Sequence, residues 1–444
     1  MQTVPGMSFW RDGSSHTVRT AIVPRKKSCA SSSQVGLSPF PSNIGRIPMI
    51  RSSRSAGTCP APLSESRQLR SCWPCSKATS TTSIFLMTSF LNELMRQERS
   101  VRFSQLISSH NRGVFAPLWL LGHACILLAG AAIFCLTRRT PRYSEYSMRE
   151  LFCLTNGRSN ELAGSLSGLL HQPYDLQGVD GVLGHLESAQ LVTIAADIDA
   201  NGYHVFETML NSTKCDELAR VANDSTAVLV PTPVGGPKAA KYDRENLLAT
   251  RYDISQSAMF EHPICQELVA DRSFLAVAQT YLGCQPVSDL AALWWTAPHG
   301  KAPDSDAAQL FHFDMDRMRF LKFFVYLSDV GPENGPHCFI QGSHKRKPRG
   351  LSRDGRISDE EIHQYYADAR FVNVYGKRGT IFAADTRGFH KGVVPTSGDR
   401  LIFQIEYANS LFGARYDTIP TGEWSAPARA DFRRFKRTFE RFVS

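Results

Sequence analysis

Short apolar segments separated by turn residues dominate the chain from about residue 289 to residue 408. Glycine, proline, asparagine and aspartate punctuate them, as in GPENGP and TSGDR, which is typical of strands joined by tight turns. We expect about eight strands with few helices between them, which predicts a closed or sandwiched β-structure. The expected strands are residues 289–297, 308–316, 319–330, 336–343, 370–376, 379–385, 390–396 and 400–408.

Helical spacing of leucine, valine and isoleucine prevails before these strands. Residues 145–198 read as a helical lead-in, followed by a strand at YHVFETML and a helix that opens with Ser212 and Thr213 in capping positions. One further helix is expected over residues 262–283, with Gly283 as its C-cap. The pattern of residues 415–444 predicts a C-terminal amphipathic helix with a stripe of phenylalanines. We expect this stripe to pack on the β-structure and not to bind a membrane surface.

The N-terminal part has a different composition. Residues 1–86 are rich in serine and arginine and show neither apolar period, which predicts a disordered tail, either a transit-like segment or an over-long gene start. Residues 87–144 form a linker, in which the uncharged run 115–136 is long enough to cross a bilayer. Arginines stand on both sides of this run, so the sequence leaves open a single-pass anchor or a buried segment.

Charge and cysteine spacing narrow the class of protein. The net charge of +9 arises in residues 1–86, where 11 basic residues face two acidic ones, and the remainder holds 39 of each sign. The body of the protein is therefore neutral, and no nucleic-acid partner is expected. The 11 cysteines are irregularly spaced, so we expect an intracellular reducing compartment, with the cytoplasm favoured.

Candidate chemistry begins in QLFHFDMDRM, where His312 and Asp314 would share one face of a strand because residues two apart point the same way. This pattern alone is common enough to arise by chance, and a surface edge would explain it. A second histidine, His390, and then Arg400 open later strand candidates. Two imidazoles and a carboxylate can hold Fe(II) with positions left open, and an arginine suits the outer carboxylate of 2-oxoglutarate.

Because they contain these four residues and the segments below, residues 199–414 resemble the phytanoyl-CoA dioxygenase (PhyH) family of Fe(II)/2-oxoglutarate oxygenases. The segments that carry the resemblance are NGYHVFETMLNSTKCDEL, VYLSDVGPENGPHCFIQGSHK and GTIFAADTRGFHKG. It implies a mainly β fold, a double-stranded β-helix (jelly roll, cupin-like) with flanking helices. It also implies that His312, Asp314 and His390 bind iron and that Arg400 pairs with the 2-oxoglutarate C5 carboxylate. Phe324 falls where the family often has an aromatic residue beside the cosubstrate, although core packing would explain it equally.

Several other residues keep plainer interpretations. His337 and His344 are expected to be structural, and Asp316 to face solvent. Trp294 and Trp295 alternate faces, so one would line the pocket and the other pack outward, although a core role is favoured. Arg387 would meet either an acidic substrate or solvent.

Two departures from the family stand out. Ile402 occupies the position where family members commonly have a small hydroxyl residue, so the outer carboxylate would lose a hydrogen bond. A charged insertion over residues 345–376 lies where such folds form a lid, which argues against phytanoyl-CoA itself as substrate.

The function predicted from these features is a dioxygenase that uses Fe(II), 2-oxoglutarate and O2 to hydroxylate a small organic substrate, lipid-like or a secondary metabolite, releasing succinate and CO2. A non-catalytic jelly-roll binding module and a membrane-anchored scaffold that keeps the fold are the alternatives. The sequence sets no oligomeric state.

Overall fold

The computed structural model describes residues 112–176, 178–422 and 424–443, and the account below concerns these residues. The tail predicted at residues 1–86 and the linker up to residue 111 lie outside them. The helices are α3 (Arg112–Thr137), α4 (Arg142–Thr155), α5 (Arg158–Leu170), α6 (Ser188–Asn201), α7 (Ser212–Asp224), α8 (Gln256–Phe260), α9 (Pro263–Val269), α10 (Arg272–Leu282), α11 (Asp359–Ile362) and α12 (Ala426–Arg434). The strands are β1 (Val179–Gly181), β2 (Gly184–Leu186), β3 (Tyr203–Met209), β4 (Ala227–Val230), β5 (Ala239–Ala240), β6 (Arg251–Ile254), β7 (Val287–Thr296), β8 (Phe320–Tyr326), β9 (His337–Ile340), β10 (Phe371–Val374), β11 (Thr380–Ala384), β12 (His390–Gly392), β13 (Arg400–Ala408), β14 (Ile419–Pro420) and β15 (Phe442–Val443).

Two antiparallel sheets form the centre of the fold. The major sheet has the order β3-β11-β8-β13-β7-β6-β4-β5, and the minor sheet has the order β10-β9-β12. From β8 to β13 the chain passes between the two sheets, because β8, β11 and β13 belong to the major one and β9, β10 and β12 to the minor one. This alternation is that of a jelly roll, so the predicted double-stranded β-helix is confirmed.

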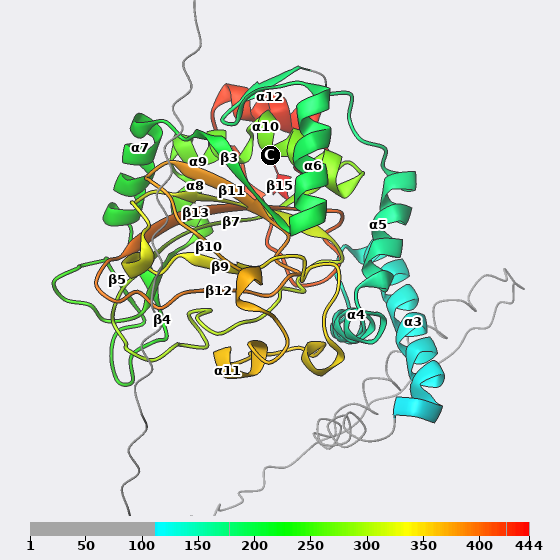
Figure 1. Cartoon of the computed structure of the whole chain (residues 1–444). Helices are drawn as coiled ribbons and strands as arrows, with labels where there is room; N and C mark the ends of the chain where they lie inside the picture. The colour runs from blue at the N-terminus through cyan, green and yellow to red at the C-terminus, as the bar shows by residue number, and fades with distance from the viewer. Residues whose placement is uncertain (1–111, 177, 423, 444) are drawn as a thin grey trace, which may run out of the picture. The chain divides into compact units, whose positions relative to one another are not determined.

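Helices cover one face of the major sheet, and the minor sheet faces the other (Figure 1). Along β8, Leu321, Phe323 and Val325 pack with residues of α9 and α10 in the main hydrophobic cluster. The alternate residues Phe324 and Tyr326 belong to a separate cluster, on the side of the minor sheet. Every residue of β8 and of β13 is buried, which explains why both segments read as nearly continuous apolar runs.

The structure corrects several expected elements. Residues 308–316 form no strand, and only Phe311 and His312 make isolated bridges. The helix expected over residues 262–283 is two helices, because the Asp271 side chain accepts hydrogen bonds from the backbone N–H groups of Ser273 and Phe274 and starts α10 afresh. Gly283 does end α10 in the left-handed conformation, as predicted.

Local capping chemistry explains two more differences. Asn211, and not Ser212 or Thr213, caps α7 by accepting from the backbone N–H of Lys214. The lead-in contains α4, α5 and most of α6, but also the hairpin β1–β2, which turns at glycine residues. The C-terminal helix is shorter than expected, because α12 ends at Arg434, yet Phe435 and Phe439 of its stripe still pack into the main cluster.

The apolar helix α3 forms an antiparallel hairpin with α4. The His123 Nδ1 and the Ser147 Oγ lie 2.9 Å apart, and the Ser144 hydroxyl donates to the Ile126 carbonyl at 3.2 Å. Nearer its C-terminal end, Phe134 contacts Phe412 edge to face, with ring centroids 5.6 Å apart. One side of α3 is therefore attached to the jelly-roll domain, while leucines on its other sides are exposed.

Candidate metal centre

His312 and Asp314 meet His390 because two segments far apart in the chain pair with each other. The backbone N–H of His312 donates to the His390 carbonyl at 3.1 Å, and that of His390 donates to the His312 carbonyl at 2.9 Å. The backbone N–H of Asp314 donates to the Thr386 carbonyl at 2.8 Å. This extended segment thus continues the minor sheet beyond β12, and it presents alternate side chains to the interior.

The three side chains converge on one point. The Nε2 atoms of His312 and His390 lie 3.6 Å and 3.5 Å from oxygens of the Asp314 carboxylate. The potential ligand atoms of the triad all lie within 4.8 Å of one another. Two imidazoles and one carboxylate in this arrangement form a donor set that suits Fe(II) and leaves coordination positions open.

Backbone carbonyls set the orientation of both imidazoles. The Nδ1 of His312 lies 2.9 Å from the Leu310 carbonyl, and the Nδ1 of His390 lies 3.0 Å from the Gly388 carbonyl. A carbonyl can only accept, so each Nδ1 carries the proton and each Nε2 offers a lone pair to the interior. Burial lowers the pKa of His312 to about 3 and also lowers the pKa of His390, which keeps both rings neutral.

A buried lysine orients the carboxylate of the triad. The Lys322 Nζ lies 2.7 Å from Asp314 Oδ2 and 3.4 Å from Glu406 Oε2. Burial alone would raise the pKa of Asp314, but the Lys322 ammonium holds it well below its usual range. Burial raises the pKa of Glu406 to about 8, against the opposing effect of Lys322. Asp314 is therefore the ionised partner of Lys322 and keeps an oxygen directed at the histidines.

Arg400 is a buried cation without a carboxylate partner among the described residues. One of its Nη atoms donates to the Gly335 carbonyl, and the other lies 3.4 Å from the Thr296 hydroxyl, while its Nε is buried and unpaired. A Cβ built on Gly392 would lie 3.3 Å from Arg400 Nη2. Because Gly392 follows His390 by two residues along β12, the guanidinium faces the same interior as the triad.

Ile402 has no hydroxyl group to offer beside Arg400, but two hydroxyl groups from other strands lie next to the guanidinium. Thr296 stands directly opposite Arg400 in the pairing of β7 with β13. The phenol of Tyr326 also interacts with the guanidinium, and it donates to the Val374 carbonyl at 2.8 Å. The Thr296 hydroxyl, on a neighbouring strand, is therefore the group near Arg400 that can donate the hydrogen bond that Ile402 cannot, because the single Tyr326 proton is already donated to Val374.

The family of this domain follows from a match in sequence. Residues 198–400, which include the triad and end at Arg400, match the profile of the family described as "Phytanoyl-CoA dioxygenase (PhyH)". These residues are a PhyH family domain. The predicted family is confirmed, and the domain is that of an oxygenase. No curated protein matches the chain.

Several solved structures are similar to the chain at low sequence identity. The non-heme α-ketoglutarate-dependent epimerase SnoN of nogalamycin biosynthesis is 19% identical, with 50% of this chain and 84% of SnoN covered and a TM-score of 0.37. EctD from S. alaskensis with bound Fe is 19% identical, with coverage of 55% and 86% and a TM-score of 0.38. HygX from Streptomyces hygroscopicus, with nickel and 2-oxoglutarate bound, is 17% identical, with coverage of 55% and 94% and a TM-score of 0.36.

Aromatic side chains line the interior of the PhyH domain. The ring of Phe324 stacks on Phe382 at 4.9 Å and lies 5.1 Å from His337. Trp294 belongs to the same inner cluster, whereas Trp295 points outward and stacks on Tyr242 at 4.4 Å. The two tryptophans therefore face opposite sides of the sheet, and Trp294 and Phe324 both pack in the buried inner cluster. A place for Phe324 beside the cosubstrate stays a prediction.

Sequence reasoning missed His337 as an interior residue. Its ring lies nearly parallel to that of His390, with centroids 5.4 Å apart, and its Nε2 is buried without a hydrogen bond. Burial holds the pKa of His337 well below its usual value. His344, by contrast, is structural as predicted, because its Nε2 lies 2.9 Å from the Asp199 carbonyl. The sequence around His337 and His344 does not show which of the two faces the interior, because this depends on how the surrounding strands pack.

Two further predictions can be compared with the structure. Arg387 meets neither substrate nor solvent, because it is buried and donates to Asp385 from Nε at 3.0 Å and to Glu161 from Nη1 at 2.8 Å. Asp316 is partly exposed and is not one of the three converging side chains; its Oδ1 lies 3.6 Å from a nitrogen of Arg149, and it also interacts electrostatically with Lys322 and Asp314.

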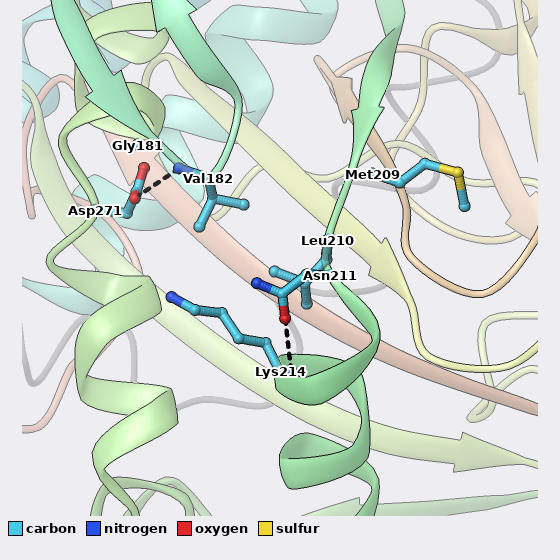
Figure 2. A pocket seen from close by; sticks show the side chains of 7 residues that line it. All are labelled: Gly181, Val182, Met209, Leu210, Asn211, Lys214 and Asp271. Atoms are coloured by element: carbon cyan, nitrogen blue, oxygen red, sulfur yellow. Dashed lines mark hydrogen bonds between the residues drawn. The ribbon is translucent and has the colours of Figure 1, made fainter.

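A hollow of about 280 Å³ lies away from the triad, between the β1–β2 turn and the PhyH domain (Figure 2). It is lined by the β1–β2 turn, the end of β3 and the start of α7, and none of the triad contributes to it. Its Asp271 and Asn211 oxygens already accept backbone hydrogen bonds from Val182 and Lys214. The chemistry of the domain is therefore expected at the triad and not in this hollow.

Proposed function

We propose that the chain is an Fe(II)- and 2-oxoglutarate-dependent dioxygenase that hydroxylates a small organic substrate. The observation that carries this proposal is the combination of the triad with Arg400. Two neutral imidazoles and an ionised carboxylate face one point, and the same interior contains a buried guanidinium that has no acidic partner within the described part of the chain. A metal ion and a dicarboxylate together would satisfy both features.

Each residue has a defined task in this proposal. His312, Asp314 and His390 would hold the iron, with Lys322 fixing the carboxylate by its 2.7 Å hydrogen bond. Arg400 and the Thr296 hydroxyl would bind the outer carboxylate of 2-oxoglutarate, and Phe324, Phe382 and Trp294 would keep water from the interior. Bound iron, 2-oxoglutarate and O2 supply the oxidant, so that one oxygen atom enters a substrate C–H bond and the other enters succinate as CO2 leaves.

Hydroxylation is preferred to halogenation because the chain keeps Asp314. In halogenating relatives of such enzymes this carboxylate is missing, which makes room for a halide. Asp314 is instead positioned by Lys322 and by its backbone hydrogen bond to Thr386.

Removal of one imidazole tests the proposal. In the full chain supplied with Fe(II) and 2-oxoglutarate, we expect His312→Ala to lose bound iron and to abolish succinate release, both measured against the wild type. His363→Ala is the matched control, since His363 is half exposed and stacks on Phe371 outside the triad. Succinate release that persists in His312→Ala would overturn the assignment. A folded wild type that binds no iron would favour the non-catalytic binding module.

We also propose that α3 attaches the protein to a lipid surface without crossing it. Residues Pro117–Thr137 are long and apolar enough to span a bilayer, and Leu118, Leu121 and Leu128 are each more than 60% exposed. However, α4 lies along α3 and carries the charged pair Glu145 and Arg149, whose placement at the centre of a bilayer would be costly. A helix lying in the membrane plane keeps these charges in water, and Arg139 would meet anionic head groups.

A further inference from the structure

The insertion between β9 and β10 pairs with the segment that carries His312 through one backbone bridge. Ile357 forms an isolated antiparallel bridge with Phe311, and its backbone N–H donates to the Phe311 carbonyl at 2.8 Å. Phe311 directly precedes His312 of the triad. This bridge adds the segment around Ile357 as a further edge of the minor sheet, next to the segment that carries two of the triad's side chains.

The register of the bridge decides where Arg356 points. In an antiparallel pair in which Ile357 faces Phe311, Arg356 stands directly across from His312, and opposite residues project to the same face of the sheet. Ile357 and Phe311 both pack in the cluster on the outer side of the minor sheet, together with Cys338 and Phe389. Arg356 therefore projects to the inner side, where His312 projects.

Arg356 is exposed, and no hydrogen bond or ion pair with it is found among the described residues. Two other cations, one on the insertion and one on β12, are neutralised. Arg353 pairs with Glu361 through two contacts of 2.7 Å and 2.5 Å, and Lys391 pairs with Asp359 through two of 2.6 Å.

We propose that Arg356 binds an anionic group, a carboxylate or a phosphate, of the substrate at the mouth of the metal centre. This inference rests on the proposed function and names the chemical class of its substrate: an organic acid whose charged end pairs with Arg356 while its body enters the aromatic interior. A guanidinium suits this task because its planar N–H groups match the oxygens of either anion. The anion site is distinct from Arg400, which is buried and faces the position proposed for the cosubstrate.

Paramagnetic line broadening tests the proposal with two small probes. The full chain is loaded anaerobically with Fe(II) and 2-oxoglutarate, and inorganic phosphate and acetate are titrated separately while their NMR line widths are followed. We expect at least one probe to broaden as it binds near the iron, and Arg356→Gln to weaken that binding about tenfold or more. Arg356→Lys should bind with intermediate strength, and Arg353→Gln, on the same insertion, should bind as the wild type does.

The outcomes distinguish failure of the proposed function from failure of the anion site alone. The visible absorption band of the iron–2-oxoglutarate complex is recorded in each sample, and its absence in the wild type would refute the proposed function itself. If the band forms but neither probe broadens, or if Arg356→Gln binds both as tightly as the wild type, the anion site is refuted alone. A weaker affinity of Arg356→Gln for 2-oxoglutarate, with probe binding unchanged, would assign Arg356 to the cosubstrate instead. Broadening by phosphate alone or acetate alone identifies the anion.

Discussion

At the scale of single residues, Arg400 is a buried charged side chain to which none of the residues that the structure describes supplies an acidic partner. The carbonyl of Gly335 and the hydroxyl of Thr296 accept from it, but neither neutralises its charge. Burial lowers the pKa of Arg400, although a guanidinium stays charged near neutral pH. A buried and uncompensated charge is costly, so its retention in the interior is explained by a bound anion.

Replacement of Arg400 should therefore affect the cosubstrate before anything else. We expect Arg400→Gln to raise the KM for 2-oxoglutarate by roughly tenfold or more. Arg400→Lys should raise the KM less, because an ammonium keeps the positive charge but cannot donate two parallel hydrogen bonds to a carboxylate. Succinate release at varied 2-oxoglutarate provides the measurement, with Arg244→Gln, at an exposed position, as control. An unchanged KM in Arg400→Gln would place the outer carboxylate elsewhere.

At the scale of elements, a buried ion pair shapes the turn between β11 and β12 that presents His390. Arg387 donates to Asp385, and Asp385 also accepts from the Tyr281 hydroxyl of α10 at 2.7 Å. Through Glu161 the same arginine reaches α5. The turn is thereby joined to both α10 and α5, and these contacts position the start of β12.

Breaking this pair should be strongly destabilising. Arg387→Met would leave the Asp385 carboxylate buried and unpaired, and we expect a loss of roughly 3–5 kcal/mol in the free energy of unfolding. Arg378→Met is the control, because its partner Asp216 is exposed and such pairs contribute about 1 kcal/mol or less. Urea unfolding of both variants at pH 7 provides the comparison, and equal losses would contradict the argument.

The same pair predicts a dependence on pH. Burial alone would raise the pKa of Asp385, but Arg387 holds it well below its ordinary value of 3.8. A carboxyl whose pKa is lower in the folded state stabilises the protein above the unfolded pKa, and that contribution is lost as the pH falls below about 4. Acidification from pH 5 to pH 3 should thus destabilise the wild type more than Arg387→Met, in which the pKa of Asp385 is no longer lowered.

At the scale of the whole molecule, the exposed leucines of α3 would bring the PhyH domain close to a lipid surface. We expect the full chain to float with vesicles that contain anionic lipid, and the double variant Leu121→Glu with Leu128→Glu to remain unbound. Val234→Glu is the control, since Val234 is fully exposed but lies between β4 and β5, away from α3. Equal flotation of the double variant would refute lipid contact through α3. A double variant that instead converts a dimer to a monomer would assign the face to a second copy of the chain.

The sequence by itself determined the identity of most strands and of the candidate site residues. Alternating or continuous apolar runs between turn residues located β7, β8, β9, β10, β11 and β13. The residue types of the triad and Arg400 were also readable, because their chemistry is a property of the side chains. The strands β4, β5 and β6 were missed because they are short and their exposed positions resemble loops.

Only the tertiary structure decided how distant segments face one another. Residues 308–316 were expected to form a strand, but they are an extended segment held by bridges to His390 and Ile357, so their structure depends on partners far along the chain. The same holds for Arg387, which turned inward to Asp385, for His337, which came to stack on His390, and for Arg356, placed across from His312. Local propensity and side-chain chemistry are written in consecutive residues, whereas register and burial are set by long-range pairing.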